Sequence, residues 1–236
     1  MDRNVVVVSG LPYSGKSWYL KRLLELPEFE EAVSIRMDDA RVALYGDRAD
    51  THVTRSEHLF KNEKTRNTIL EKLVLGNSLL VTEVMMPTEE GHQRPFVEMI
   101  HRANDYVQAI EREYAVRDQE PMPNPASKVF LKVILFHSSL EVIRRRVADS
   151  SEERRLSNAG FFDFEGMRGA ATIFTFPRIY EPLILDTSDE SQVTHASRTR
   201  EIIDFVFNGS LPYNQAECQQ IAEEHLQEVR HALRIT

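Results

Sequence analysis

The sequence predicts a three-layer α/β fold, in which a parallel sheet of about five strands lies between two layers of helices. Short apolar runs alternate with longer amphipathic stretches along most of the 236 residues, which is typical of βαβ units. The strand candidates are residues 5–8, 32–35, 78–82, 129–136 and 183–185. The first of them, VVVV, is apolar at every position, as expected of a strand that is buried on both faces.

Helical periodicity fills most of the segments between these strands. Helices are expected over residues 16–26, about 38–45, 54–75, from about 95 onward, 139–149, 191–207 and about 215–233. The last helix follows a turn at 208–213 and adds to the alternating pattern, either packed on the body or serving a partner. We therefore expect one domain over residues 1–207 and a C-terminal helical extension over 208–236.

Charge and composition narrow the class of protein. The net charge of −8 argues against a protein that coats nucleic acid, but it allows an enzyme that touches a strand end through a local basic patch. No apolar run approaches the roughly 20 residues of a membrane span. The N-terminal residues lack signal-peptide features, and Cys218 is the single cysteine, so we expect a cytoplasmic protein with no membrane contact.

A phosphate-binding loop is the strongest motif in the chain. Residues 10–17, GLPYSGKS, match G-x-x-x-x-G-K-[ST] and stand between a predicted strand and a predicted helix. The glycines allow loop amides to point inward as an anion nest, Lys16 reaches the β- and γ-phosphates, and the Ser17 hydroxyl is the expected Mg²⁺ ligand. The nucleotide-binding residues expected here are Gly10, Tyr13, Ser14, Gly15, Lys16, Ser17 and Trp18. We also expect Trp18 to pack against the sheet.

The motifs of two other classes of nucleotide-binding protein are absent from the sequence. The chain has no N-K-x-D sequence of the kind with which GTPases select guanine. A motor ATPase would show an apolar strand that ends in Asp-Glu, whereas the run at 79–82 is followed by the single carboxylate of Glu83.

A second polar segment follows the second strand candidate. The stretch SIRMDDAR at 34–41 places a carboxylate and an arginine three residues apart at the start of a predicted helix, where i and i+3 share a face. Asp38 could accept a proton from an attacking hydroxyl while Arg41 holds the acceptor, which is much of what phosphoryl transfer needs. The alternative is a helix N-cap, supplied by Asp38 or Asp39, beside an exposed arginine.

These segments resemble the kinase domain of polynucleotide 5′-kinases and, equally, the zeta-toxin and chloramphenicol phosphotransferase branch of P-loop kinases. The resemblance rests on residues 10–18, on Asp38 and Arg41, and on the strand that ends at Glu83. It implies ATP and Mg²⁺ as cofactors, Asp38 as the general base and Arg41 as the residue that grips the acceptor. Glu83 stands where the family usually has Asp, so the carboxylate that the resemblance implies at the metal is carried here by a longer side chain.

The same resemblance implies an arginine-bearing lid over about residues 144–162. Arg146 best matches the family's lid arginine that covers the transferring phosphate. The family often has a second arginine about four residues later, but that position falls in DSS at 149–151, so Arg154 is the next candidate. The alternative for the cluster at 144–146 is a cationic last helical turn that complements the helix dipole.

Weaker signals concern the base, the acceptor and metals. Asp186, Thr187 and Ser188 follow the last strand candidate, in a connection that in P-loop kinases often lies beside the adenine, so they are candidates for the base pocket, although turn chemistry explains the segment equally well. The basic residues Arg36, Arg41, His52, Arg55, Lys61 and Lys64 could form an acceptor patch or an exposed helix of alternating charge. The histidines show no metal-binding spacing, so no zinc site is expected.

Two functions remain open from the sequence. The first is an ATP- and Mg²⁺-dependent kinase that phosphorylates a hydroxyl of a polynucleotide 5′ end or of a small metabolite such as a nucleotide sugar. The second is a regulatory module that binds ATP and acts on a protein partner, for instance through the C-terminal helix.

Overall fold

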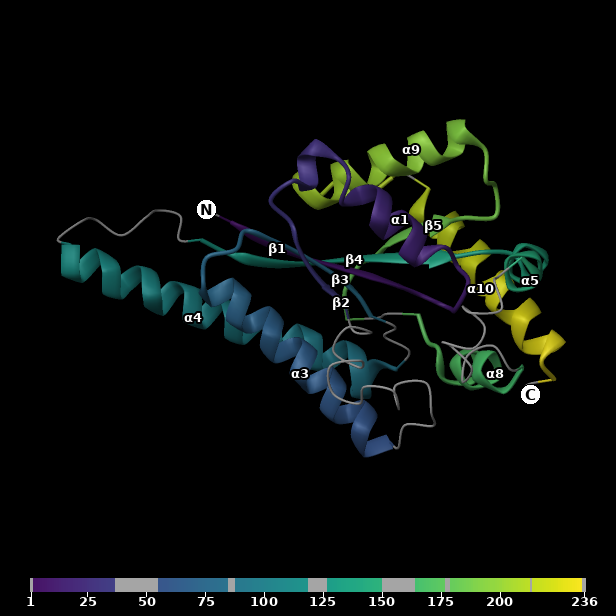
Figure 1. The fold of residues 1–236 in the computed structure, drawn as a ribbon, viewed down its shortest axis with the longest axis horizontal. Helices are drawn as coiled ribbons and strands as arrows, with labels where there is room; N and C mark the ends of the chain where they lie inside the picture. Colours follow the sequence, from purple (N-terminus) through teal and green to yellow (C-terminus); the bar gives the residue numbers. More distant parts are fainter. Residues whose placement is uncertain are drawn as a thin grey trace.

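The computed structural model describes residues 2–36, 55–84, 88–118, 127–149, 164–176, 179–212 and 214–234. Within these residues, five parallel strands form one sheet in the order β2-β3-β1-β4-β5 (Figure 1). The strands are β1 (Arg3–Gly10), β2 (Val33–Arg36), β3 (Leu79–Glu83), β4 (Val129–His137) and β5 (Leu183–Asp186). Each overlaps its candidate from the sequence, so the predicted three-layer α/β fold is confirmed.

Helices cover both faces of this sheet. They are α1 (Lys16–Leu23), α3 (Arg55–Val74), α4 (Arg94–Asp118), α5 (Leu140–Ala148), α8 (Phe164–Ile173), α9 (Gln192–Ile203) and α10 (Gln215–Ala232), with short turns η1 (Pro27–Phe29), η3 (Glu89–Gln93) and η4 (Asp204–Asn208). In Figure 1, α1 and α9 lie on one face and α3 and α4 on the other, while α5, α8 and α10 gather near the carboxyl ends of the strands. The phosphate-binding loop, which follows β1, therefore lies at the end of the sheet where the carboxyl ends of the parallel strands meet.

The valines of β1 explain why this strand lies in the middle of the sheet. Val5, Val6, Val7 and Val8 are fully buried. Val6 and Val8 belong to the apolar cluster under α1 and α9, whereas Val5 and Val7 belong to the cluster under α3 and α4. Each such burial contributes roughly 1.5–3 kcal/mol, so both faces of β1 hold the layers together.

The C-terminal helix is packed on the body, which is the first of the two alternatives that the sequence left open. Ala222, Leu226 and Val229 are buried against α5, α8 and β5. The Arg230 guanidinium donates to the carbonyl oxygens of Ala171, at 2.9 Å, and of Phe174, at 2.8 Å. The apolar face of α10 is therefore used within the chain, and only its polar face remains for a partner.

Two outcomes differ from the sequence-based expectations, and two expected segments cannot be compared because they lie outside the described residues. Helix α8 was not expected, because its sequence FEGMRGAATI contains two glycines, which lower helix propensity by about 1 kcal/mol each. The expectation that Trp18 packs against the sheet is wrong, since 42% of this residue is exposed. The helix expected at 38–45 and most of the lid expected at 144–162 lie outside the described residues. Among the helices that the structure describes, none is long and apolar enough to cross a membrane.

Candidate active site

The backbone of the phosphate-binding loop depends on two glycines. Gly10 ends β1 with a φ of +141°, and a Cβ on it would lie 2.1 Å from the carbonyl oxygen of Phe136 on the neighbouring strand. Gly15 has a φ of +89° and is the N-cap of α1. Tyr13, at the tip, is one of the non-glycine residues with positive φ, at +62°. Such angles are costly for residues with a side chain, so Gly10 and Gly15 adopt them without strain, whereas Tyr13 is strained.

The phosphate side of the site consists of residues 10–17 together with Glu83. The Lys16 Nζ donates to the carbonyl oxygen of Leu11 at 2.7 Å, which keeps the ammonium group close to its own loop. The Ser17 hydroxyl donates to Oε1 of Glu83 at 2.9 Å, across 66 residues of sequence. The register explains this contact, because Glu83 pairs with Val8 and so lies beside the start of the loop.

These groups fit the magnesium and the nucleotide that the motif implies. A hydroxyl and a carboxylate within hydrogen-bonding distance provide the hard oxygen ligands that Mg²⁺ prefers. The positive φ angles of Gly10 and Gly15 curve the backbone before the start of α1, where amides and the helix dipole favour phosphate.

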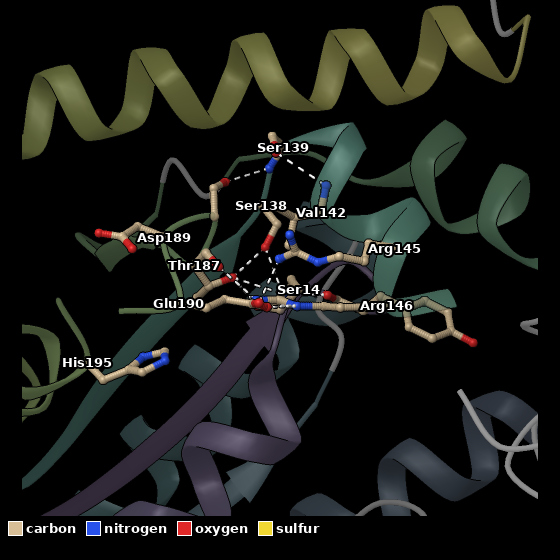
Figure 2. Close-up of polar contacts among 12 residues, drawn as sticks. Ser14, Ser138, Ser139, Val142, Arg145, Arg146, Thr187, Asp189, Glu190 and His195 are labelled. Atoms are coloured by element: carbon tan, nitrogen blue, oxygen red, sulfur yellow. Dashed lines mark hydrogen bonds and ion pairs between the residues drawn. The ribbon is translucent and has the colours of Figure 1, made fainter. Parts of the chain in front are cut away.

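We use the term base side for the part of the site near the end of β5, where the sequence analysis expected the adenine base. It is a set of side chains around Arg146, shown in Figure 2: Ser138, Arg146, Thr187 and Glu190. The Nη1 of Arg146 donates to the carbonyl oxygen of Tyr13 at 2.8 Å and to Ser138 Oγ at 2.9 Å. Its Nη2 donates to the carbonyl oxygen of Thr187 at 2.7 Å, and its Nε donates to Oε1 of Glu190 at 2.9 Å. With its side chain only 20% exposed, Arg146 joins α5 to the tip of the phosphate-binding loop.

Thr187 is the second residue that connects this side of the site. It is fully buried, and its hydroxyl lies 2.8 Å from the carbonyl oxygen of Ser14 and 2.9 Å from that of His137. Its hydroxyl also contacts the Ser138 hydroxyl. One side chain therefore ties the phosphate-binding loop to the ends of both β4 and β5.

Asp186, which the sequence suggested for the base pocket, contacts Ser188 and lies near His137. Its Oδ1 accepts hydrogen bonds from the Ser188 amide, at 2.8 Å, and the Ser188 hydroxyl, at 2.6 Å. The same atom lies 3.9 Å from Nδ1 of His137. Successive residues of an extended chain face opposite sides, and here Thr187 rather than Asp186 reaches the phosphate-binding loop.

An aromatic rim flanks the loop at the start of α1. The Trp18 ring lies 4.5 Å from the His195 ring between centroids, and the Arg22 guanidinium lies 4.5 Å from the Trp18 centroid. His195 Nδ1 is 2.7 Å from the Tyr19 hydroxyl. Burial, followed by the nearby Arg198 charge, lowers the pKa of His195 from its ordinary value, and burial raises the pKa of Tyr19. The rim therefore presents a neutral imidazole and an exposed indole, a surface suited to stacking.

The remaining residues predicted for the site divide into two groups. Asp38, Arg41 and Arg154 lie outside the described residues. Arg36, the last residue of β2, pairs with Glu83, so β2 ends at the same edge of the sheet as the phosphate side.

Sequence reasoning missed Ser138, Glu190 and His195, whereas Thr187 lies within the turn at 186–188 that it suggested for the base pocket. The three missed residues stand in polar turns or helix starts after strands, where such residues are common for reasons of capping alone. The one signal that points to them is their position after β4 and β5, because β4 pairs with β1 and ends beside the loop, and β5 pairs with β4.

The comparisons with known proteins bear on the fold. No protein-family model matches the chain, and no curated protein matches its sequence. Among solved structures, a putative kinase from Chloroflexus aurantiacus superposes with a TM-score of 0.56, at 13% identity over 86% of this chain and 97% of that one. The APS kinase of Mycobacterium tuberculosis, solved with AMPPNP and APS, gives 0.53 at 15% identity over 86% and 96%. A sugar kinase from Janibacter gives 0.53 at 12% identity over 90% and 100%.

The chain has a P-loop kinase-like fold. The matched structures cover most of both chains, so the likeness extends over the whole fold rather than over a single motif. This agrees with the resemblance that the motifs of residues 10–18 and Glu83 suggested.

Proposed function

We propose that the protein is a phosphotransferase that uses ATP and Mg²⁺ to phosphorylate a hydroxyl group. The observation that carries the proposal is the 2.9 Å contact between the Ser17 hydroxyl and Glu83, next to Lys16, at the edge where β2 ends. It joins a phosphate-binding loop to a carboxylate from another strand, as metal-dependent phosphoryl transfer requires. The single cysteine, Cys218, supports the reducing cytoplasm as the compartment.

Each residue of the phosphate side has a role in this proposal. Lys16 and the loop amides bind the β- and γ-phosphates, and Ser17 with Glu83 hold the metal or its water ligands. Mg²⁺, when bound, neutralises charge on the phosphates. Trp18 and His195 offer the aromatic surface for the base, while Arg146 and Thr187 hold the loop in shape beside it.

Asp38 and Arg41 supply the acceptor chemistry in the proposal. Both follow β2 in the sequence, and Arg36, the last residue of that strand, pairs with Glu83. The acceptor oxygen forms its bond to the γ-phosphorus as the bond to the β-phosphate oxygen breaks, and the acceptor proton passes to the Asp38 carboxylate. Arg41 orients the acceptor, and Arg154 covers the transferring phosphate.

The acceptor is proposed to be either a polynucleotide 5′-hydroxyl or a small anionic metabolite, such as a nucleotide sugar. Transfer of labelled γ-phosphate from ATP and Mg²⁺ to two pools distinguishes them. One pool holds 5′-hydroxyl DNA and RNA oligonucleotides, and the other holds nucleosides, sugar nucleotides and antibiotic-like alcohols. Label in one pool alone names the acceptor class.

Matched variants test the residues. Lys16→Ala is expected to lower transfer by at least about a hundredfold, because a cation on the transferring phosphate is lost, while Lys21→Ala on the exposed face of α1 is expected to have little effect. Asp38→Asn is expected to lower the rate by about 10²–10⁴, with Asp39→Asn as its neighbour control. Transfer that survives Asp38→Asn and falls in Asp39→Asn would assign the base to Asp39.

A second function has one observation in its favour. Arg146, which was expected to cover the phosphate, donates instead to four groups of the protein itself. Under this alternative, ATP binding affects a protein partner through α5, and no phosphate is transferred. Tight ATP binding, followed by the fluorescence of Trp18, with no transfer to either pool would favour the regulatory module over the kinase.

A further inference from the structure

Three side chains that can bind metals converge where β4, β5 and α10 meet. His137 and Asp186 are the last residues of their strands and pair in register, and His225 projects from α10. The Nδ1 atoms of His137 and His225 are 3.0 Å apart, and Nδ1 of His137 is 3.9 Å from Oδ1 of Asp186. One donor atom from each residue falls within 4.8 Å of the other two.

The spacing of these atoms suits a small tetrahedral ion. With bonds of about 2.0–2.1 Å, two donors on one tetrahedral ion stand about 3.3 Å apart. The observed 3.0 Å and 3.9 Å lie on either side of this value, and all three donor pairs lie within 4.8 Å, so side-chain adjustments of at most about 1.5 Å would complete the geometry. The imidazole planes are inclined by 51° with centroids 5.1 Å apart, so the rings meet at their nitrogen edges rather than face to face.

Neighbouring groups hold two of these side chains in place. His137 is 8% exposed at the end of a buried strand, which fixes its ring. The Asp186 carboxylate is oriented by hydrogen bonds from the amide and the hydroxyl of Ser188. Outer hydrogen bonds of this kind usually orient the ligands of protein metal sites.

Space for a fourth ligand lies beside the histidines. A cavity of about 20 Å³ is lined by His137 and His225, with Leu11, Phe174 and Phe176 among its apolar walls. This volume admits about one water molecule. Two imidazoles, one carboxylate and a water form a mixed nitrogen and oxygen set that favours Zn²⁺ over Mg²⁺ or Ca²⁺, which prefer oxygen alone.

We propose that His137, Asp186 and His225 form a binding site for a divalent transition metal ion, with Zn²⁺ as the best fit. The site is separate from the Ser17–Glu83 pair and does not rest on the kinase proposal. Its three ligands come from two strands and α10, so a bound ion cross-links the C-terminal helix to the carboxyl edge of the sheet. Ser138 and Thr187, which follow these two strands, contact Arg146. The proposed metal site is therefore adjacent to the base side.

The sequence could not reveal this cluster by spacing. His137 and His225 are 88 residues apart, and no short motif links them to Asp186. The register of β4 with β5 and the packing of α10 bring them together, which explains why spacing alone predicted no zinc site.

The test is a titration of the full chain, free of any polyhistidine tag and treated with EDTA, with Zn²⁺ in the presence of excess Mg²⁺. We expect one equivalent of Zn²⁺ to bind and the melting temperature to rise. Co²⁺ in its place is expected to give the intense visible absorption bands of tetrahedral coordination. No bound equivalent, or an octahedral Co²⁺ spectrum in the unaltered chain, would overturn the proposal.

Matched histidine variants locate the ion. His225→Gln is expected to weaken Zn²⁺ binding by more than the roughly 10–100-fold that loss of an outer partner costs. His231→Gln, at an exposed position on the same helix, is expected to leave binding unchanged. Asp186→Asn serves as a second variant if His225→Gln does not fold, as checked by circular dichroism. Zn²⁺ binding that either folded variant retains in full would show that the ion binds elsewhere.

Discussion

Gly10, Tyr13 and Gly15 shape the phosphate side of the site through their backbone angles, whereas the base side is held by side chains around Arg146 and Thr187. The backbone angles are encoded within eight consecutive residues. The side-chain contacts join residues that are 8 to 173 positions apart. The curve of the loop backbone is therefore a local property of the chain, whereas the contacts around Arg146 and Thr187, like the contact between Ser17 and Glu83, exist only after the sheet has assembled.

The largest expected effect comes from changing the backbone of the phosphate-binding loop. Gly10→Ala would place a Cβ 2.1 Å from the Phe136 carbonyl oxygen, at a φ of +141°, so the backbone must move. We expect a loss of at least about 3 kcal/mol in the free energy of unfolding, together with loss of ATP binding. Urea denaturation measures the first quantity, and Trp18 fluorescence follows the second.

Gly76→Ala is the matched control for this prediction. Gly76 also has a positive φ, at +100°, but nothing lies within 4 Å of the position of its Cβ. We expect only the left-handed conformational cost of about 1 kcal/mol. Equal losses for the two variants would mean that strain alone, and not the approach to β4, makes Gly10 necessary.

The base side is tested next by Arg146→Lys. A lysine keeps the charge but cannot donate in the several directions that the guanidinium uses toward Tyr13, Ser138, Thr187 and Glu190. We expect a loss of about 2–4 kcal/mol in the free energy of unfolding. Arg145→Lys, which alters a half-exposed ion pair with Glu190, is expected to cost at most about 0.5 kcal/mol. Similar costs for the two would refute the role of Arg146 as a connector.

A smaller effect is expected from Thr187→Val. The change removes a buried hydroxyl that lies within hydrogen-bonding distance of the carbonyl oxygens of Ser14 and His137, at a cost of about 1–2 kcal/mol. Thr187→Ser keeps the hydroxyl and is expected to lose less. In a double-mutant cycle with Arg146→Lys, the two costs should be non-additive, because the residues share contacts. Strict additivity would separate them into independent contacts.

The smallest effect concerns the aromatic rim and pH. Because burial and Arg198 lower the pKa of His195, the native ring takes up a proton below pH 6.5, the ordinary value, whereas the unfolded chain takes it up near that value. This contribution to stability is therefore present above pH 6.5 and declines as the pH falls. A protonated imidazole quenches indole fluorescence, so the emission of Trp18 should fall along the native titration. His195→Gln should remove this step, and a midpoint above 6.5 would contradict the lowered pKa.

The sheet was predictable because its strands are short, apolar and separated by helical periodicity. Val5–Val8 identified a strand buried on both faces, and the structure confirms it. Helix α8 was not predictable in the same way, because Gly166 and Gly169 lower its helix propensity. Packing of Ala170 and Ala171 in the same apolar cluster as α10 stabilises the helix instead. Trp18 was misplaced for a similar reason, since helical spacing does not reveal which face meets the sheet.

The sequence by itself determined the phosphate-binding loop, the class of fold and the acidic surface charge, because each depends on neighbouring residues or on composition. Tertiary structure alone decided that Ser17 meets Glu83, that Thr187 rather than Asp186 reaches the loop, and that His137 meets His225. The physical reason is strand order. Parallel pairing brings the carboxyl ends of β3, β1, β4 and β5 to one edge, and side chains far apart in the chain acquire partners that no local pattern encodes.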